Sequence, residues 1–200
     1  DYIESIGGKA IMTADIHERA SDRAAEAMAK IEKIKGKKVD ILVMVQGDEP
    51  MDTPEMITEA LAPMEWDEAV QVVNLMGRID NEEEFDDANV VKVVVGQDNN
   101  AIYFSREPIP SRKKSMEDVP MLKQICVIPF RRDYLLEFNK TPETPLERIE
   151  SVDMLRVIES GGGVRMVMTE FPSVGVDTPQ DLEIVRELMT DDPLMRKYLS

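Results

Sequence analysis

Two aspartates stand where a strand pattern gives way to a helix pattern, and a carboxylate at such a junction could bind a metal ion. Asp48 follows the apolar residues 41–45, and Asp177 comes just before the pair Thr178-Pro179. Open α/β sheets bind their ligands beyond the carboxyl ends of the strands, and Mg²⁺ is typically held by one or two carboxylates together with substrate phosphates. The pair therefore suggests a Mg²⁺ site, although a strand-to-helix turn would also favour Asp48 and a helix N-terminus would favour Asp177.

Residues 12–23 lead from an apolar run into a helical pattern, and they include side chains that could contact a ligand. Ser21 can cap the helix or hydrogen-bond a ligand, and Arg23 can contact an anion or pair with Asp22 or Glu26. Each residue suits a structural role as well as a functional one, so both interpretations stay open at this point.

The charge of the chain limits the ligands that such a site can bind. Its 200 residues include 40 acidic and 24 basic ones, which gives a formal net charge of −16. This charge disfavours a nucleic-acid partner, and a small anion must then be held by local cations or a metal. One cysteine and one histidine exclude an internal disulfide and a His-rich zinc site, and they favour a cytoplasmic location. The longest uninterrupted apolar run, residues 41–45, is far shorter than the roughly 20 residues of a membrane helix, so no membrane association is expected.

Apolar periodicity places these residues on alternating strands and helices. It predicts helices that begin near Ser21, Thr53, Thr144 and Thr178, and the third of them is expected to continue to residue 158. Apolar or β-rich runs predict strands over residues 9–13, 39–45, 69–75, 90–95, 101–105, 124–130 and 164–169. The alternation predicts an α/β fold with a mixed, mainly parallel sheet in a single domain over residues 1–200. Within it, residues 90–130 are expected to form a hairpin and arm insertion.

Five short motifs follow one another along the chain. They are Val45-Gln46-Gly47-Asp48-Glu49-Pro50-Met51, Asn89-Val90-Val91-Lys92-Val93-Val94, Tyr103-Phe104-Ser105-Arg106, Ile109-Pro110 and Gly175-Val176-Asp177-Thr178-Pro179. Any one motif alone would be weak, but five in the correct order are strong. In this order they resemble one enzyme family, the CMP-Kdo synthetases, which are 3-deoxy-manno-octulosonate cytidylyltransferases. The resemblance covers nearly the whole chain, from Gly7-Gly8 to Leu182.

The resemblance implies a Rossmann-like nucleotide-diphospho-sugar transferase fold, in a homodimer whose central hairpin and arm contribute to the subunit contact. It implies that Asp48 and Asp177 are catalytic residues that ligate Mg²⁺. The reaction would be attack by the anomeric hydroxyl of a sugar acid on the α-phosphorus of CTP, giving a CMP-sugar and pyrophosphate. The resemblance also implies that the cytidine and ribose lie along Gln46, Thr13, Ser21 and Arg23.

The chain departs from the family pattern at its beginning. The family starts with a strand, a basic glycine-containing loop, a helix and a second strand, and Asp1 corresponds to the helix that follows this βαβ unit. Because the loop is the family's principal triphosphate holder, the chain alone is expected to be inactive. The family's Ser-Gly-Thr at the cytidine contact also reads Arg19-Ala20-Ser21 here.

The sugar side departs further, because Lys123, Gln124 and Asp153 fall where the family has other sugar-contacting residues. An amide both donates and accepts hydrogen bonds and a carboxylate can pair with an ammonium, so Gln124 and Asp153 would suit an amino-substituted sugar acid. Alternatively, Gln124 caps a strand end and Asp153 lies on a solvated helix face. The leading hypothesis is CMP-Kdo synthesis in the lipopolysaccharide precursor pathway. The alternatives are the same chemistry on an 8-amino Kdo or a sialic-type acid, and a non-catalytic truncated dimerisation module.

Overall fold

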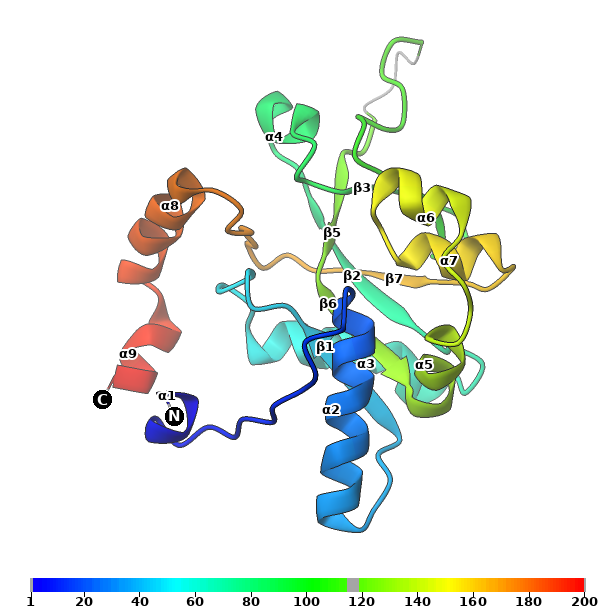
Figure 1. The fold of residues 1–200 in the computed structure, drawn as a ribbon. Coiled ribbons are helices and arrows are strands. Elements are labelled where there is room, and N and C mark those ends of the chain that lie inside the picture. The colour runs from blue at the N-terminus through cyan, green and yellow to red at the C-terminus, as the bar shows by residue number, and fades with distance from the viewer. Residues whose placement is uncertain (1, 115–118, 200) are drawn as a thin grey trace.

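The computed structural model describes residues 2–114 and 119–199 (Figure 1). Its strands are β1 (Ile41–Val45), β2 (Val73–Arg78), β3 (Lys92–Val95), β4 (Ala101–Ser105), β5 (Leu122–Ile125), β6 (Val127–Arg131) and β7 (Arg165–Met168). Its helices are α1 (Tyr2–Ser5), α2 (Ala20–Lys35), α3 (Pro54–Trp66), α4 (Glu82–Asp86), α5 (Arg132–Phe138), α6 (Pro145–Glu150), α7 (Met154–Glu159), α8 (Pro179–Thr190) and α9 (Pro193–Leu199).

The strands form a five-stranded sheet in the order β4-β3-β5-β2-β7 and a two-stranded sheet of β1 and β6. The predicted α/β fold with a mixed sheet is confirmed. Most pairs are antiparallel and β2 with β7 is the parallel pair among them, whereas the sequence favoured mainly parallel pairing. The segment predicted as an insertion, residues 90–130, supplies β3, β4 and β5 to the larger sheet, and part of its predicted arm, residues 115–118, lies outside the described residues.

The side chains of strand β2 and of the residue before it alternate between the two faces of the sheet. Both faces are packed against other elements. Val73 and Leu75 pack on the side of α3. Val72 and Met76 belong to the larger core cluster, which also contains residues of α2, α5 and α7. Asn74, which is completely buried, lies on this second side by the same alternation.

The single strand predicted over residues 124–130 is two strands, β5 and β6, which belong to different sheets. The chain passes from one sheet to the other at Cys126. Its backbone N–H donates to Glu49 Oε1 over 3.0 Å, and the carbonyl of Ile125 accepts a hydrogen bond from Asn74 Nδ2 over 2.7 Å. These two side chains satisfy backbone groups that a continuous strand would have paired within a sheet.

The single helix predicted to run to residue 158 is also divided, into α6 and α7. Ser151 ends α6 in the left-handed region, with φ of +53°. The buried carboxylate of Glu147 accepts two hydrogen bonds from the buried guanidinium of Arg156, at 2.8 and 2.5 Å, which ties the two short helices together. The break places Asp153 at the start of α7.

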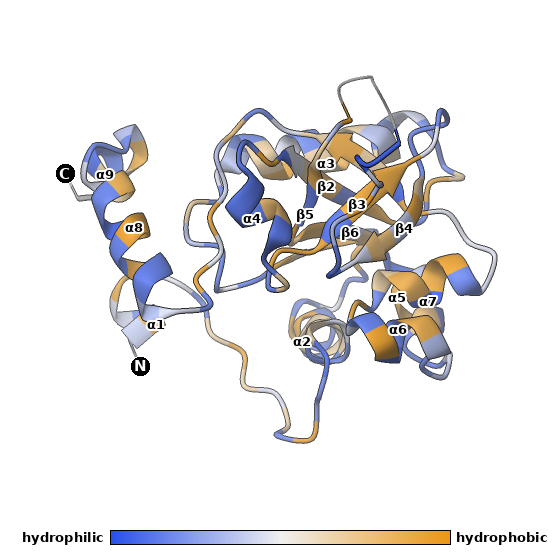
Figure 2. Ribbon diagram, turned by 90° about the horizontal axis from the view of Figure 1, so that it is seen from above, coloured by the Kyte–Doolittle hydropathy of each residue, from blue (hydrophilic) through white to orange (hydrophobic). Residues whose placement is uncertain are grey.

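The strand predicted over residues 9–13 is absent, since residues 8–14 have no regular structure. A strand needs a neighbour to pair with, and within the described part of the chain this segment is held to α2 by side chains instead. Lys30 Nζ donates to the carbonyl of Met12 over 2.7 Å, and the Glu26 carboxylate accepts from the N–H of Ala14. Figures 1 and 2 show α1, α8 and α9 beside the body that the sheets form.

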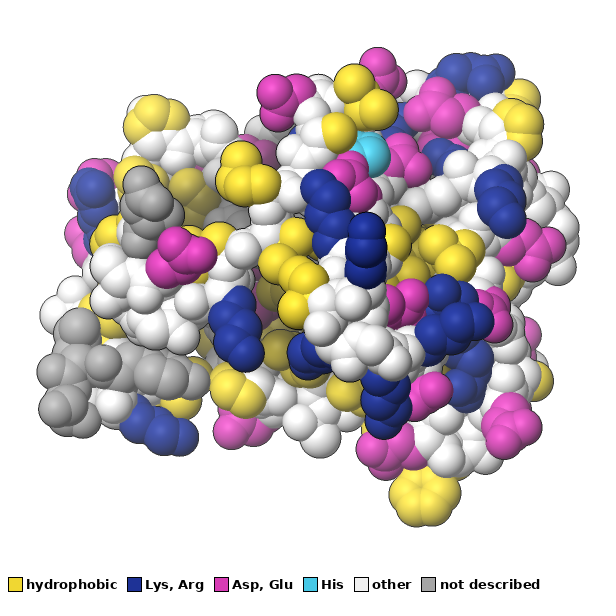
Figure 3. Space-filling model, turned by 60° about the horizontal axis from the view of Figure 1, so that its bottom comes forward, with side chains coloured by type: hydrophobic (Ala, Val, Ile, Leu, Met, Phe, Trp, Pro, Cys, Tyr) yellow, Lys and Arg dark blue, Asp and Glu magenta, His cyan; other side chains and the backbone are white. Residues whose placement is uncertain are grey.

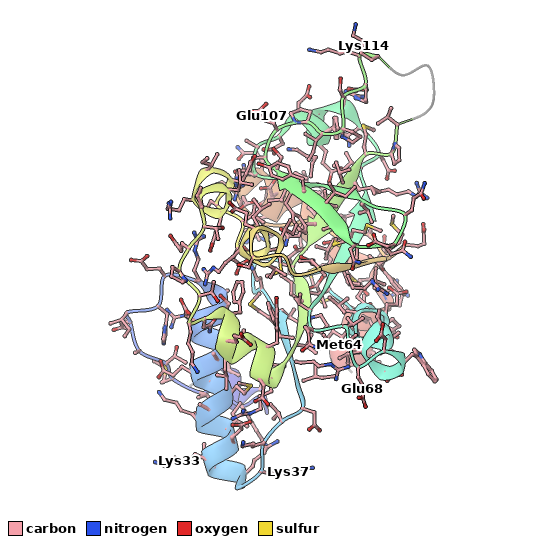
Figure 4. The ribbon with its side chains drawn as sticks, turned by 90° about the vertical axis from the view of Figure 1, so that its right-hand side faces the viewer. Lys33, Lys37, Met64, Glu68, Glu107 and Lys114 are labelled. Carbon is pink, nitrogen blue, oxygen red and sulfur yellow. The ribbon has the colours of Figure 1, made fainter. Side chains whose placement is uncertain are left out.

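The end of α2 and the predicted insertion lie on opposite sides of the sheets. Figure 4 shows Lys33 and Lys37 at and just beyond the end of α2, on the opposite side of the sheets from Glu107 and Lys114 in the predicted insertion. Among the helices that the structure describes, none combines the length and the apolar composition needed to cross a membrane.

Candidate active site

A cavity of about 1050 Å³ lies between the loop after β1, strand β5, the start of α7 and the segment that leads to α8. Six of the nine residues predicted for the site line this main cavity, which brings together positions far apart in the sequence. They are Gln46, Asp48, Lys123, Gln124, Asp153 and Asp177.

The two predicted metal ligands lie on loops that are hydrogen-bonded to each other. The N–H of Val176 donates to the carbonyl oxygen of Asp48 over 2.8 Å. Partial desolvation by the surrounding loop raises the pKa of Asp177, and the neighbouring charge of Asp48 raises it further. Asp181 fixes the second loop, because its carboxylate accepts hydrogen bonds from the backbone N–H groups of Asp177 and Thr178 at 3.1 and 2.7 Å. The two aspartates therefore line the same cavity from two loops that are bonded to each other.

The pair fits a hard cation that keeps other ligands. Within residues 2–114 and 119–199, no group of three or more His, Cys, Asp or Glu side chains is arranged to hold a metal ion. Mg²⁺ does not need such a cage, because it is commonly bound by one or two carboxylates together with substrate phosphates and water. Two exposed carboxylates at the mouth of a cavity provide oxygen ligands of this kind.

Glu49 was not predicted as a site residue, yet it joins three parts of the cavity wall. Its carboxylate accepts from the N–H of Cys126 and from the hydroxyl of Ser173. It thereby connects the loop after β1 to the strand break and to the segment before α8. The only sequence signal was its position next to Asp48 in the Gly-Asp-Glu-Pro motif.

Asp52 is a second acidic group that the sequence did not single out. Its two carboxylate oxygens are buried without a hydrogen-bond partner among the described residues. Burial raises its pKa from 3.8 to about 7, with smaller contributions from the charges of Glu49 and Asp48. Asp52 is therefore largely protonated below neutral pH, and it adds little negative charge to the loop there.

The predicted sugar-facing residues lie on the inner wall of the main cavity. Gln124 donates from Nε2 to Asn74 Oδ1 over 2.5 Å. Lys123 Nζ binds Glu84 Oε1 at 2.5 Å and the carbonyl of Ser173 at 2.8 Å. Asp153 is half-buried at the start of α7, where burial raises its pKa, with the charge of Glu147 as the next cause. Asp153 thus lines a cavity and does not lie on a solvated helix face.

The predicted nucleotide-facing residues are divided between two places. Thr13 and Arg23 line a second hollow of about 910 Å³ along β1 and α2, the β1–α2 groove, which Gln46 and Asp48 share with the main cavity. Arg23 Nη1 donates to Thr13 Oγ1 over 2.6 Å. Ser21 is buried and lines neither hollow. Its role at the nucleotide stays a prediction.

The basic residues of the main cavity are few and largely engaged. They are Arg19, Arg78, Arg106 and Lys123. Arg19 pairs with Glu143 at 3.1 Å, and Arg106 donates to the carbonyls of Glu150 and Ala88 at 2.7 and 2.8 Å. Carboxylates outnumber these cations along the wall. A polyphosphate would therefore need an added cation to bind here.

Comparison with known proteins shows the family to which the chain belongs. A family model described as cytidylyltransferase matches residues 1–169. This chain belongs to the cytidylyltransferase family. A 3-deoxy-manno-octulosonate cytidylyltransferase of Geobacter metallireducens is 39% identical to it, over 95% of this chain and 76% of the relative. The enzyme of the same name from Geotalea uraniireducens is 39% identical, over 92% of this chain and 75% of the relative.

A solved structure agrees with these relatives. The structure of CMP:2-keto-3-deoxy-manno-octonic acid synthetase complexed with CTP is similar to this cytidylyltransferase, with a TM-score of 0.83 and 38% identity. The match covers 94% of this chain and 75% of that chain. The family and the fold predicted from the five motifs are therefore confirmed.

Proposed function

We propose that this cytidylyltransferase transfers CMP from CTP to a 3-deoxy-octulosonate-type sugar acid and releases pyrophosphate, which is the reaction of CMP-Kdo synthesis. The names of its relatives and the CTP complex of its structural neighbour support this function. The observation that carries it is the hydrogen bond from Val176 to Asp48, because this bond holds two acidic loops together at the edge of the main cavity.

In this proposal, Asp48 and Asp177 would hold one Mg²⁺ together with the phosphates of CTP. Mg²⁺ bound there would supply charge neutralisation to the phosphates and to the α-phosphate as charge develops on it. Gln46, which lies where the two hollows meet, contacts the nucleotide with Thr13, Ser21 and Arg23 along the β1–α2 side. The protein groups supply the orientation of the nucleotide, and the sugar acid approaches from the wall formed by Lys123, Gln124 and Asp153.

The identity of the sugar acid rests on Gln124 and Asp153. Kdo is the leading substrate because it is the sugar named for the relatives. An amino-substituted octulosonate or a sialic-type acid is the second candidate, and the carboxylate of Asp153 in the cavity wall favours it, since a carboxylate pairs with an ammonium. Competition between Kdo and its 8-amino analogue for the enzyme separates the two candidates.

The homodimer and the cytoplasmic location are further proposals. The hairpin of β3 and β4 and the following arm would form part of the subunit contact. A third proposal is that residues 1–200 act only as a dimerisation module without turnover, and the scarcity of free basic groups in the main cavity favours it. Sedimentation velocity measures the dimer, and a turnover assay separates the enzyme from the module.

The test is the release of pyrophosphate from CTP in the presence of Mg²⁺ and Kdo. The chain is assayed alone and after fusion to the part of the Geobacter metallireducens relative that the match leaves uncovered. We expect the fusion to turn over and Asp48→Asn to lower its rate by about a hundredfold or more. Asp40→Asn is the matched control, because the exposed Asp40 lies just before β1, at the strand end opposite Asp48. A folded fusion that releases no pyrophosphate, or a fully active Asp48→Asn variant, contradicts the proposal.

A further inference from the structure

Asn74 is completely buried in β2, and every polar atom of its side chain has a partner. Its Nδ2 donates to the carbonyls of Ile125 and Leu75 at 2.7 and 2.9 Å. Its Oδ1 accepts from Gln124 Nε2 at 2.5 Å. The side chain thus bridges the break between β5 and β6 and one residue of the cavity wall.

The arrangement fixes the orientation of both amides. A carbonyl oxygen can only accept a hydrogen bond, so the Asn74 atom that faces the two backbone carbonyls must be its NH₂ group. The remaining atom, Oδ1, can only accept, so Gln124 must present its own NH₂ group to it. A rotation of either amide by a half-turn would bring two acceptors or two donors together in a buried place, which is costly.

The fixed amide orientations decide which atom of Gln124 remains available at the surface of the main cavity. One N–H of Gln124 Nε2 is committed to Asn74, and the carbonyl oxygen Oε1 of the same amide receives no hydrogen bond within residues 2–114 and 119–199. Gln124 and Asp153 both line this cavity, and Asp153 is also an acceptor when ionised. At the Gln124 position the wall therefore offers an acceptor, and a ligand group that satisfies it must be a donor.

We propose that Asn74 is a positioning residue that locks the Gln124 amide with Oε1 toward the main cavity, so that the site selects a sugar acid bearing a hydrogen-bond donor, a hydroxyl or an ammonium, at the position that Gln124 contacts. This inference rests on the proposed function, in which Gln124 faces the sugar. It adds a residue outside the cavity that determines which substituents the cavity accepts.

The test compares analogues of the octulosonic acid in which single hydroxyl groups are replaced by fluorine, which is similar in size but cannot donate. Kd values are measured by ligand-observed NMR with CTP and Mg²⁺ present. In the unmodified protein, we expect one position at which fluorine weakens binding by about tenfold. Gln124→Met should remove this discrimination, whereas Gln71→Met, a control whose amide binds backbone carbonyls away from the cavity, should retain it.

Two variants of Asn74 separate positioning from a structural role. Asn74→Leu and Asn74→Asp both remove the amide NH₂ that faces the carbonyls of Ile125 and Leu75, so both variants alter the strand break. Asn74→Asp keeps an acceptor for Gln124 and should keep the tenfold discrimination, whereas Asn74→Leu frees the amide to rotate and should lose it. If Asn74→Leu keeps the discrimination, or both variants lose it equally, the positioning role is wrong.

A measurement on the unmodified protein decides the matter even if the Asn74 variants fail to fold. One side-chain amide proton of Gln124, assigned through its absence in Gln124→Met, should exchange with solvent at least tenfold more slowly than those of the exposed Gln180. Equal exchange rates would overturn the inference. A different result is that this proton is protected but Gln124→Met binds every analogue with the Kd of the unmodified protein. The amide of Gln124 is then locked by Asn74, but Gln124 does not face the sugar, and that part of the proposed function is wrong.

Discussion

The backbone N–H of Val176 lies 2.8 Å from the carbonyl oxygen of Asp48, and this hydrogen bond joins two loops that are more than a hundred residues apart in the chain. Because the bond uses backbone atoms, it leaves the carboxylates of Asp48 and Asp177 free to face a ligand. The acidic site is therefore held together by the main chain and is not created by the ligand.

The first prediction concerns this bond. Val176→Pro removes the donor, so the two loops should separate and the affinity for Mn²⁺, used as a paramagnetic substitute for Mg²⁺, should fall by about tenfold. Val174→Pro is the control, since the N–H of Val174 donates to no described group. Electron paramagnetic resonance measures free Mn²⁺ in both. Equal affinities in the two variants would show that the bond does not organise the site.

The second prediction concerns Asp52, whose pKa rises from 3.8 to about 7 in the folded protein. Between these values the folded state binds more protons than the unfolded state, so stability falls as pH rises through this window. Asp52→Asn removes the penalty of charging a buried group. It should raise the Tm at pH 8 and change it little at pH 4, where Asp52 is protonated when folded. A Tm gain that is the same at both pH values contradicts this explanation.

The third prediction concerns the buried pair of Glu147 and Arg156. Arg156→Met leaves the Glu147 carboxylate buried without its partner, and it should lower the free energy of unfolding by about 3–5 kcal/mol. Arg186→Met, which removes one partner of the exposed pair with Glu183, should cost less than about 1 kcal/mol. Urea denaturation measures both. Similar losses in the two variants would mean that the Glu147–Arg156 pair does not hold α6 to α7.

The fourth prediction concerns the open side of β1. Among the described strands, β6 is its one partner, and the apolar β1–α2 groove lies along it. Figure 3 shows apolar side chains exposed between charged ones on the lower face of the molecule. Unpaired strand edges promote association, so the chain should form assemblies larger than a dimer as its concentration rises. Val45→Lys, at a side chain that is 42% exposed, should reduce them. Sedimentation of a single species at all concentrations contradicts this.

Local signals were sufficient for much of the fold. The capping residues Thr53 and Thr178 stand at the helix starts where the sequence predicted them, because a cap and its partner lie within one turn. The hairpin of β3 and β4 was also predicted from a local signal, because its two β-rich runs are joined by a short loop. The expectation that Asp48 and Asp177 lie together followed from their places at strand-to-helix junctions and from the family resemblance, and both residues line the main cavity.

The features that the sequence did not reveal depend on distant partners. The apolar run around Cys126 gives no sign of a strand break, because the groups that satisfy the break, Glu49 and Asn74, come from other parts of the chain. The end of α6 at Ser151 depends on a left-handed residue that is not glycine. Residues 9–13 have a strand-like composition, but composition does not supply a neighbouring strand.

The most direct test of the shared cation is paramagnetic broadening of backbone amide signals by Mn²⁺ in the presence of CTP. If Asp48 and Asp177 bind one ion, the amide signals of Gly47, Asp48, Val176 and Asp177 should broaden together at the same Mn²⁺ concentration, and either Asp48→Asn or Asp177→Asn alone should restore all four. Asp40→Asn should leave the broadening unchanged. Broadening of the two loops at different Mn²⁺ concentrations, or its persistence in either single variant, would contradict a site built from both aspartates.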